Sequence, residues 1–248
     1  MLQGPRPDPI FVLGHQKSGT TAVAALLSEA TERTATLDIL EDHRNRDFCR
    51  VLGSEMPIED YVSRYPVAFR KCIIKEPNLT LMGPQLAERF PDARWVMVIR
   101  DPVQNIRSLL DRVGVAGDLD HLDGDAIRAL QAPWNLLFEH PTGDADWPEH
   151  YIDQLAERWC LFAQVTWKMP TVPIVVRYED FSKDKQGCIE SLANELGETV
   201  RVDIASRVDI ARQPAGARRM RPEADVFGNN LARIHARCAD VIRKLESV

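Results

Sequence analysis

The segment Pro9–Leu27, PIFVLGHQKSGTTAVAALL, constrains the fold more than any other part of the chain. Its apolar run Ile10–Leu13 predicts a buried strand, and the polar stretch Gly14–Gly19 predicts a loop. Thr20–Ser28, with alanine and leucine repeating on one face, predicts a helix. A strand that enters a helix through a tight loop is typical of α/β folds. The start of such a helix presents free backbone N–H groups, which favour an anion.

The rest of the chain alternates predicted strands with predicted helices. The strands are Lys71–Lys75, Arg94–Arg100 and Thr171–Tyr178, and the helices are Asn78–Phe90, Val103–Arg112, His150–Lys168 and Asn229–Lys244. Gly114–His150 reads as a loop with a short helix. This alternation predicts an α/β fold with a central parallel sheet flanked by helices, whose ligands bind beyond the carboxyl ends of the strands. Without repeats or linkers, the chain is expected to form a single domain over residues 1–248.

Composition narrows the classes of partner. The formal net charge of −6 argues against a general nucleic-acid partner. No apolar run is long enough to span a bilayer, so no membrane insertion is expected. Five cysteines stand apart, without a CxxC pair, which predicts reduced thiols rather than disulfides or a metal site. With no signal-peptide pattern at the start, a cytoplasmic location is expected.

The predicted loop carries groups that bind phosphate. Gly14 and Gly19 let the backbone turn and approach an anion closely, and Lys17 adds a positive charge. In a nucleoside-triphosphate loop, GxxxxGKS/T, the lysine follows the second glycine, whereas here Lys17 precedes Gly19. In this order KSGTT resembles the 5′-phosphosulfate loop of sulfotransferases that use 3′-phosphoadenosine 5′-phosphosulfate (PAPS). The resemblance implies that PAPS is bound by Gln16, Lys17, Ser18, Gly19, Thr20 and Thr21.

A second anion site is expected because PAPS also carries a 3′-phosphate. In WVMVIRDPVQNIRSLL, Arg100 ends a predicted strand and Ser108 follows eight residues later. The segment is similar to the family's 3′-phosphate motif, in which arginine and serine at this spacing hold the phosphate. Tyr178 in VRYEDF matches a tyrosine that lies near the adenine in the family. GARRMRPEADVFG resembles the family's basic loop that closes over the 3′-phosphate, with Arg218 and Arg219 as candidates.

The resemblance implies a P-loop-like sulfotransferase fold that moves a sulfuryl group from PAPS to a hydroxyl. The product would be 3′,5′-ADP (PAP), and no metal would be needed. Lys17 would neutralise the leaving oxygen, and a general base would take the acceptor proton. Cytosolic members carry a histidine after a strand lysine, but CIIKEPN contains none. Other members use a glutamate after the first helix. Here LDILEDHRNR offers Glu41, Asp42 and His43. Glu41 is the first candidate, His43 the second and Glu76 the third.

Two other functions remain open: a P-loop kinase or NTPase using ATP and magnesium, and a nucleotide-binding relic with a partner-binding role. The acceptor side, Thr31–Arg70 and Gly114–His150, matches no known motif. Aromatic residues are concentrated in Trp134–Trp167, where they would line an apolar pocket or simply pack a core. By elimination, the expected acceptor is a small hydroxylated molecule, either a metabolite or a bacterial natural product.

Overall fold

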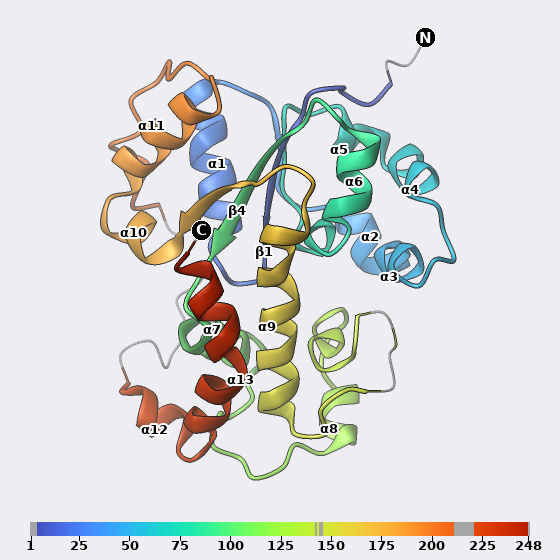
Figure 1. Cartoon of the computed structure of the whole chain (residues 1–248), viewed down its shortest axis with the longest axis vertical. Coiled ribbons are helices and arrows are strands. Elements are labelled where there is room, and N and C mark those ends of the chain that lie inside the picture. Colours follow the sequence, from blue (N-terminus) through green and yellow to red (C-terminus); the bar gives the residue numbers. More distant parts are fainter. Residues whose placement is uncertain (1–3, 142, 144–145, 211–220, 248) are drawn as a thin grey trace. The chain divides into compact units, whose positions relative to one another are not determined.

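The computed structural model describes residues 4–141, 143, 146–210 and 221–247, and Figure 1 labels its elements. Residue contacts divide the chain into two compact units. The first comprises Met1–Arg100 and Val165–Gln213, and the second comprises Asp101–Gln164 and Pro214–Val248. The expected single domain over residues 1–248 stays a prediction.

A five-stranded parallel sheet forms the centre of the first unit. In spatial order its strands are β2 (Ala35–Thr36), β3 (Ile73–Ile74), β1 (Ile10–Gly14), β4 (Arg94–Ile99) and β5 (Ile174–Arg177). β1 pairs in parallel with β3 and β4, and β4 pairs in parallel with β5. Every residue of β1 is buried, as a central strand covered on both faces requires. The predicted α/β class with a central parallel sheet is confirmed.

Helices cover both faces of this sheet, with α1, α10 and α11 on one side of the strands and α5 and α6 on the other (Figure 1). Side chains of alternate β1 residues point to opposite faces of the sheet. Ile10 and Val12 join the hydrophobic cluster formed with α1 and α11, whereas the Phe11 ring stacks on Trp95 with 4.7 Å between centroids. The helices are α1 (Thr20–Thr31), α5 (Pro66–Phe69), α6 (Gly83–Arg89), α10 (Tyr178–Lys183) and α11 (Lys185–Glu195).

The prediction of a single helix over Asn78–Phe90 is wrong. A short 3₁₀ turn, η1 (Pro77–Thr80), comes first, and α6 begins only at Gly83. Pro84 in the first turn of α6 is the physical reason. Proline has no N–H to donate, and within a continuous helix its ring would clash with the carbonyl four residues earlier.

The segment between α1 and β3 contains elements that the sequence does not predict. Besides β2 and α5, it forms α2 (Leu40–Asn45), α3 (Asp47–Leu52) and α4 (Ile58–Arg64). None of these helices exceeds seven residues. Such lengths show too little of a helical repeat for the pattern of apolar residues to reveal them.

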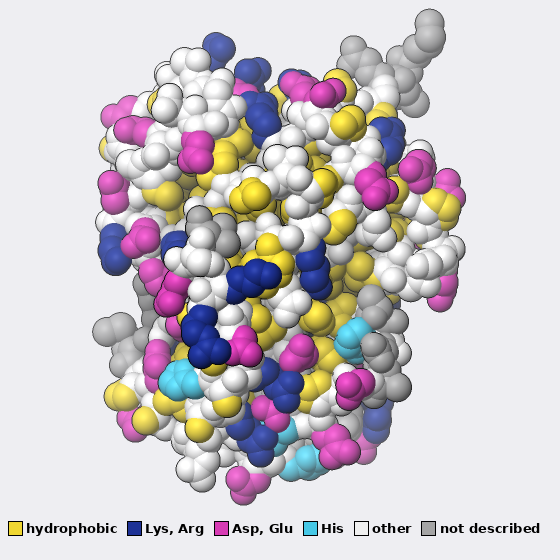
Figure 2. Space-filling model, in the orientation of Figure 1, with side chains coloured by type: hydrophobic (Ala, Val, Ile, Leu, Met, Phe, Trp, Pro, Cys, Tyr) yellow, Lys and Arg dark blue, Asp and Glu magenta, His cyan; other side chains and the backbone are white. Residues whose placement is uncertain are grey.

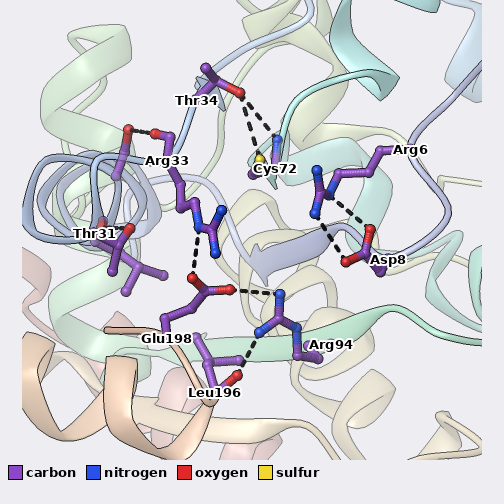
Figure 3. A network of polar contacts seen from close by, with 11 residues as sticks. Arg6, Asp8, Thr31, Arg33, Thr34, Cys72, Arg94, Leu196 and Glu198 are labelled. Carbon is purple, nitrogen blue, oxygen red and sulfur yellow. Dashed lines mark hydrogen bonds and ion pairs between the residues drawn. The ribbon is translucent and has the colours of Figure 1, made fainter. Parts of the chain in front are cut away.

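Ion pairs hold the first unit together at the amino ends of its strands (Figure 3). The Glu198 side chain, only 6% exposed, pairs with Arg33 Nε at 2.8 Å and with Arg94 Nη2 at 2.9 Å. Arg94 begins β4, Arg33 follows α1, and Glu198 follows α11. One carboxylate therefore ties three elements together, and it does so at the end of the sheet opposite the carboxyl ends of the strands.

The second unit is helical in its described part. It contains α7 (Pro102–Val113), α8 (Gly124–Arg128), η2 (Trp134–Phe138), most of α9 (Tyr151–Lys168), α12 (Glu223–Phe227) and α13 (Asn230–Leu245). The predicted helices at α7, α9 and α13 are confirmed. The Asp101 carboxylate caps α7 by accepting the Gln104 N–H at 2.9 Å. None of the five cysteines, all of which lie in the described residues, forms a disulfide.

Surface charge and the apolar character of the helices are relevant to nucleic acids and membranes as partners. On the face drawn in Figure 2, Lys and Arg side chains are interspersed with Asp and Glu. This mixture fits the formal net charge of −6 better than a continuous basic surface would. Within the described residues, no helix combines the length and apolar character needed to cross a membrane.

Candidate active site

The loop after β1 is anchored at its first residue. The Gly14 N–H donates to Thr80 Oγ1 at 2.9 Å, and the Thr80 hydroxyl lies 3.1 Å from the Gly14 carbonyl oxygen, to which it donates. Gly14 has φ of 144°, and a Cβ there would lie 2.5 Å from the Val98 carbonyl oxygen on β4. Only glycine fits this position, because the loop leaves the sheet in close contact with the neighbouring strand.

Two residues in left-handed conformations then turn the loop into α1. Lys17 has φ of 67° and Gly19 has φ of 93°. The N-cap residue of α1 is Gly19, which has no side chain with which to cap the helix. The backbone N–H groups and the positive end of the dipole at such a helix start favour an anion. Among the other predicted loop residues, Ser18 and Thr20 are buried, whereas Gln16 and Thr21 are half-buried.

Arg100 and Tyr178 meet the loop from the ends of β4 and β5. Arg100 Nη1 donates to the Lys17 carbonyl oxygen at 2.8 Å, and its guanidinium carbon lies 4.5 Å from the centroid of the Tyr178 ring. The same ring lies against Gly19, where a Cβ would be 2.4 Å from Tyr178 Cδ2. The structure therefore brings Lys17, Gly19, Arg100 and Tyr178 together. All four residues were predicted from the sequence, whereas these contacts were not.

Three further residues were predicted to bind the donor. Ser108 lies half-buried on α7, in the second unit. Arg218 and Arg219 lie outside the described residues. Their predicted roles at the 3′-phosphate stay predictions.

A second polar cluster, which we call the His43–Glu76 pair, follows β3. Glu76 is 1% exposed. Its Oε2 lies 2.9 Å from His43 Nε2 and accepts the Ile39 N–H at 3.0 Å, while its Oε1 accepts the Asn78 N–H at 3.1 Å. Glu41 lies exposed on the same helix as His43. Of the three base candidates, the structure thus brings His43 and Glu76 into direct contact.

The pair shifts the pKa values of both members. Burial raises the pKa of Glu76, but the hydrogen bond and charge of His43, with smaller effects from Lys75 and the Ile39 N–H, outweigh it and leave the pKa below its usual value. The hydrogen bond to Glu76 raises the pKa of His43, against the opposing effect of burial. Glu76 is therefore a weak base, and His43 is a stronger one than a free histidine.

A hydrogen bond connects the two clusters. Gln16 Nε2, in the loop, donates to Asn78 Oδ1 at 3.0 Å, and Asn78 also donates its N–H to Glu76. Gln16, predicted as a donor-binding residue, thus joins the loop to the His43–Glu76 pair through one intervening residue. The loop and the pair form one continuous polar site in the first unit.

One group of side chains near this pair has the spacing of a metal site. Ligand atoms of Asp38, His43 and Glu76 all lie within 4.8 Å of one another. However, the Lys75 ammonium lies 2.8 Å from Asp38 Oδ1, where it would repel a cation. Lys75 pairs with Asp38, and Glu76 accepts backbone N–H groups from Ile39 and Asn78, so we interpret this group as a hydrogen-bonded network.

Comparison with known proteins identifies the family. The sulfotransferase domain family model matches residues 7–213. A sulfotransferase structure from Mycobacterium avium aligns over 98% of this chain and 77% of its own, with 13% identity and a TM-score of 0.60. A sulfotransferase from Alicyclobacillus acidocaldarius aligns over 92% and 94%, with 17% identity and a TM-score of 0.47. A mouse sulfotransferase complexed with PAP aligns over 97% and 85%, with 15% identity and a TM-score of 0.46.

No curated protein matches the chain. The family match nevertheless spans the whole parallel sheet, the loop after β1 and the His43–Glu76 pair. The Mycobacterium avium structure shares the fold over nearly all of the chain. This chain belongs to the sulfotransferase domain family.

Proposed function

We propose that the enzyme transfers a sulfuryl group from PAPS to a hydroxyl of a small-molecule acceptor. The observation that carries the proposal is the loop after β1. It places Lys17 in a left-handed conformation before Gly19, the N-cap residue at the start of α1. Family membership supports sulfate transfer in general, and the loop supports PAPS as the donor.

The site residues fit the chemistry of this donor. The 5′-phosphosulfate would lie on the backbone N–H groups at the start of α1, with hydroxyl groups from Ser18, Thr20 and Thr21 nearby. The 3′-phosphate is proposed to bind the guanidinium groups of Arg100, Arg218 and Arg219 and the hydroxyl of Ser108. Tyr178 is proposed to lie beside the adenine. When bound, PAPS supplies the activated sulfuryl group.

Lys17 is proposed to neutralise the charge that develops on the leaving oxygen. A fixed positive charge at that point lowers the barrier, because its attraction for the leaving oxygen is stronger in the transition state than in the ground state. Arg100 holds the Lys17 carbonyl at 2.8 Å, and this contact orients the lysine backbone. No step of this mechanism requires a metal ion.

His43 is the proposed general base, with Glu76 as the residue that orients it. Glu76 Oε2 faces His43 Nε2 at 2.9 Å, and a buried carboxylate selects the tautomer with its proton on Nε2. Nδ1 then has a lone pair to accept the acceptor proton. Glu76 is the weaker candidate because three donors already occupy its oxygens, and Glu41 lies exposed.

The test replaces Lys17 with alanine. Turnover with PAPS should fall by roughly 10²–10³-fold, as it does when one donor to a developing charge is removed. Lys183→Ala is the matched control, because this lysine lies exposed on α10, where it forms an ion pair with Asp180. Wild-type turnover in Lys17→Ala would remove the lysine from the mechanism.

A thermal-shift measurement tests the donor separately. PAP should raise the melting temperature, because a ligand that binds only the folded state stabilises it. ADP with magnesium should raise it less. A larger shift with ADP and magnesium would favour a kinase or NTPase and overturn the proposal. The metabolite or natural-product nature of the acceptor, and the cytoplasmic location, stay predictions.

A further inference from the structure

The helix that carries His43 is too short to hold it in place by itself. α2 spans six residues, and isolated helices shorter than about 12–15 residues are marginal in water. Its start is fixed on one side, where the N–H of Ile39, the N-cap residue, donates to Glu76 at 3.0 Å. The orientation of His43 therefore depends on what holds the other side of α2.

Asp42, the residue before His43, supplies that second attachment. It is fully buried at 0% exposure. Its Oδ1 accepts the Phe48 N–H of α3 at 3.0 Å, and its Oδ2 accepts the Tyr61 hydroxyl of α4 at 2.9 Å. Tyr61 is itself 0% exposed, and its ring packs edge-on against Phe69 with 6.1 Å between centroids. One carboxylate thus joins α2 to two neighbouring helices.

We propose that Asp42 is a positioning residue for His43. Together with Tyr61 it fixes α2 so that the imidazole meets Glu76, and it places a buried negative charge beside that imidazole. The inference rests on the proposed function, in which His43 is the general base. It assigns a role to a carboxylate that touches neither the donor loop nor, by its described hydrogen bonds, His43.

The charges around His43 support a coupling between the two residues. Its ring is hydrogen-bonded to Glu76, and Asp38 and Asp42 act on it through their charges, all raising the pKa of His43 against the opposing effect of burial. Lys75 pairs with Asp38. Burial raises the pKa of Asp42 to about 6, although the Tyr61 hydroxyl and the Phe48 N–H lower it. Asp42 is therefore ionised above that pH, and neutralising it should lower the pKa of His43.

The chain contains a matched control one helix further on. Asp47 is also buried, at 1% exposure, and also accepts a tyrosine hydroxyl, that of Tyr65, at 2.6 Å. Its other partners are Arg50 and Arg64. Asp47→Asn therefore disturbs a buried aspartate–tyrosine pair of the same kind without changing the charge on the residue next to His43.

The first experiment follows the imidazole of His43 by NMR titration in the full chain, with its signal assigned from His43→Gln. In Asp42→Asn, which keeps the side-chain shape, the midpoint should move to lower pH, whereas Asp47→Asn should leave it in place. An unmoved midpoint in folded Asp42→Asn overturns the inference. This readout involves no substrate, so it is independent of the proposed reaction.

The second experiment measures kinetics. Asp42→Ala should lower kcat by roughly 10- to 100-fold through misplacement of His43 and leave the KM for PAPS unchanged. Tyr61→Phe, which keeps the carboxylate, should lower kcat in the same direction and carries the test if Asp42→Ala does not fold. Wild-type kcat in a folded Tyr61→Phe would contradict the positioning role. Wild-type kcat in His43→Gln would instead overturn the base assignment on which the inference rests.

Discussion

At the scale of single residues, the loop is shaped by contacts with residues far away in the sequence. Gly14 lies against β4, Gly19 lies against the Tyr178 ring, and the Lys17 carbonyl accepts a hydrogen bond from Arg100. The loop residues themselves were predictable, because glycine, lysine and hydroxyl side chains at a helix start indicate phosphate binding. The contacts were not, because a single sequence carries no signal for a pair such as Lys17 and Arg100, 83 residues apart.

Gly19→Ala tests the packing of this loop. A Cβ at residue 19 would meet two ring carbons of Tyr178 at 2.4 and 2.6 Å. Such distances force either the ring or the loop to move, so affinity for PAP should fall by at least tenfold. Calorimetric titration with PAP measures the change.

Gly114→Ala distinguishes the effect of the clash with Tyr178 from the effect of backbone strain. Gly114 also has a positive φ, 72°, but a Cβ there meets nothing within 4 Å. This variant should lose about 1 kcal/mol of folding free energy and keep its affinity for PAP. Equal affinity losses in the two variants would show that the Tyr178 contact is unimportant.

At the scale of elements, the length of a helix or strand decides whether it can be predicted from the sequence. β1, β4, α7, α9 and α13 were predictable because each shows its own hydrophobic pattern. The short helices α2, α3 and α4 were not, because side chains such as Asp42 and Asp47 stabilise them through tertiary hydrogen bonds. The His43–Glu76 contact belongs to this unpredicted part. Both residues were therefore predicted as base candidates, but the exposed Glu41 was predicted ahead of them.

The Glu198 ion pairs provide a test at this scale. Glu198→Gln should lower the free energy of unfolding by about 1–2 kcal/mol at neutral pH, because a buried carboxylate that accepts two guanidinium groups becomes neutral. Burial raises the pKa of Glu198, but Arg33 and Arg94 lower it more, and its pKa lies below the usual value. The stabilisation is therefore present above the unfolded carboxyl pKa and disappears as the pH falls through the folded value.

Urea unfolding at a series of pH values measures this effect. Asp180→Asn is the control, because its ion pair with Lys183 is exposed and should contribute almost nothing. The KM for PAPS should be unchanged in Glu198→Gln, because Glu198 lies at the opposite end of the sheet from the loop. A pH-independent loss of stability would indicate a packing defect rather than a lost ion pair.

At the scale of the whole molecule, the fold class and the family followed from the order of a few segments. A strand–loop–helix start, a later buried strand ending in arginine and another ending in tyrosine predict a parallel sheet with its site at the carboxyl ends. Pairing in the structure confirms the sheet and adds β2 at its edge. The acceptor could not be predicted, because the segments Thr31–Arg70 and Gly114–His150 match no known motif.

Asp42 also affects the pH dependence of overall stability. Its pKa is raised to about 6, mainly by burial, so its contribution to folding is fully present below the unfolded carboxyl pKa. That contribution is lost as the pH rises through about 6. Asp42→Asn removes this loss, so its stability relative to wild type should increase between pH 4 and pH 7. Urea unfolding at a series of pH values measures this difference in stability. A difference between the two proteins that does not change with pH would contradict a raised pKa of Asp42.

The hydrogen bond between the Ile39 N–H and Glu76 allows the state of the site to be followed by experiment. The oxygen that accepts this N–H also faces His43 Nε2, so the backbone amide and the imidazole share one acceptor. Hydrogen exchange at Ile39 therefore measures how often the start of α2 separates from Glu76. The rate at a single backbone amide would follow the assembly of the proposed base without substrate, donor or turnover.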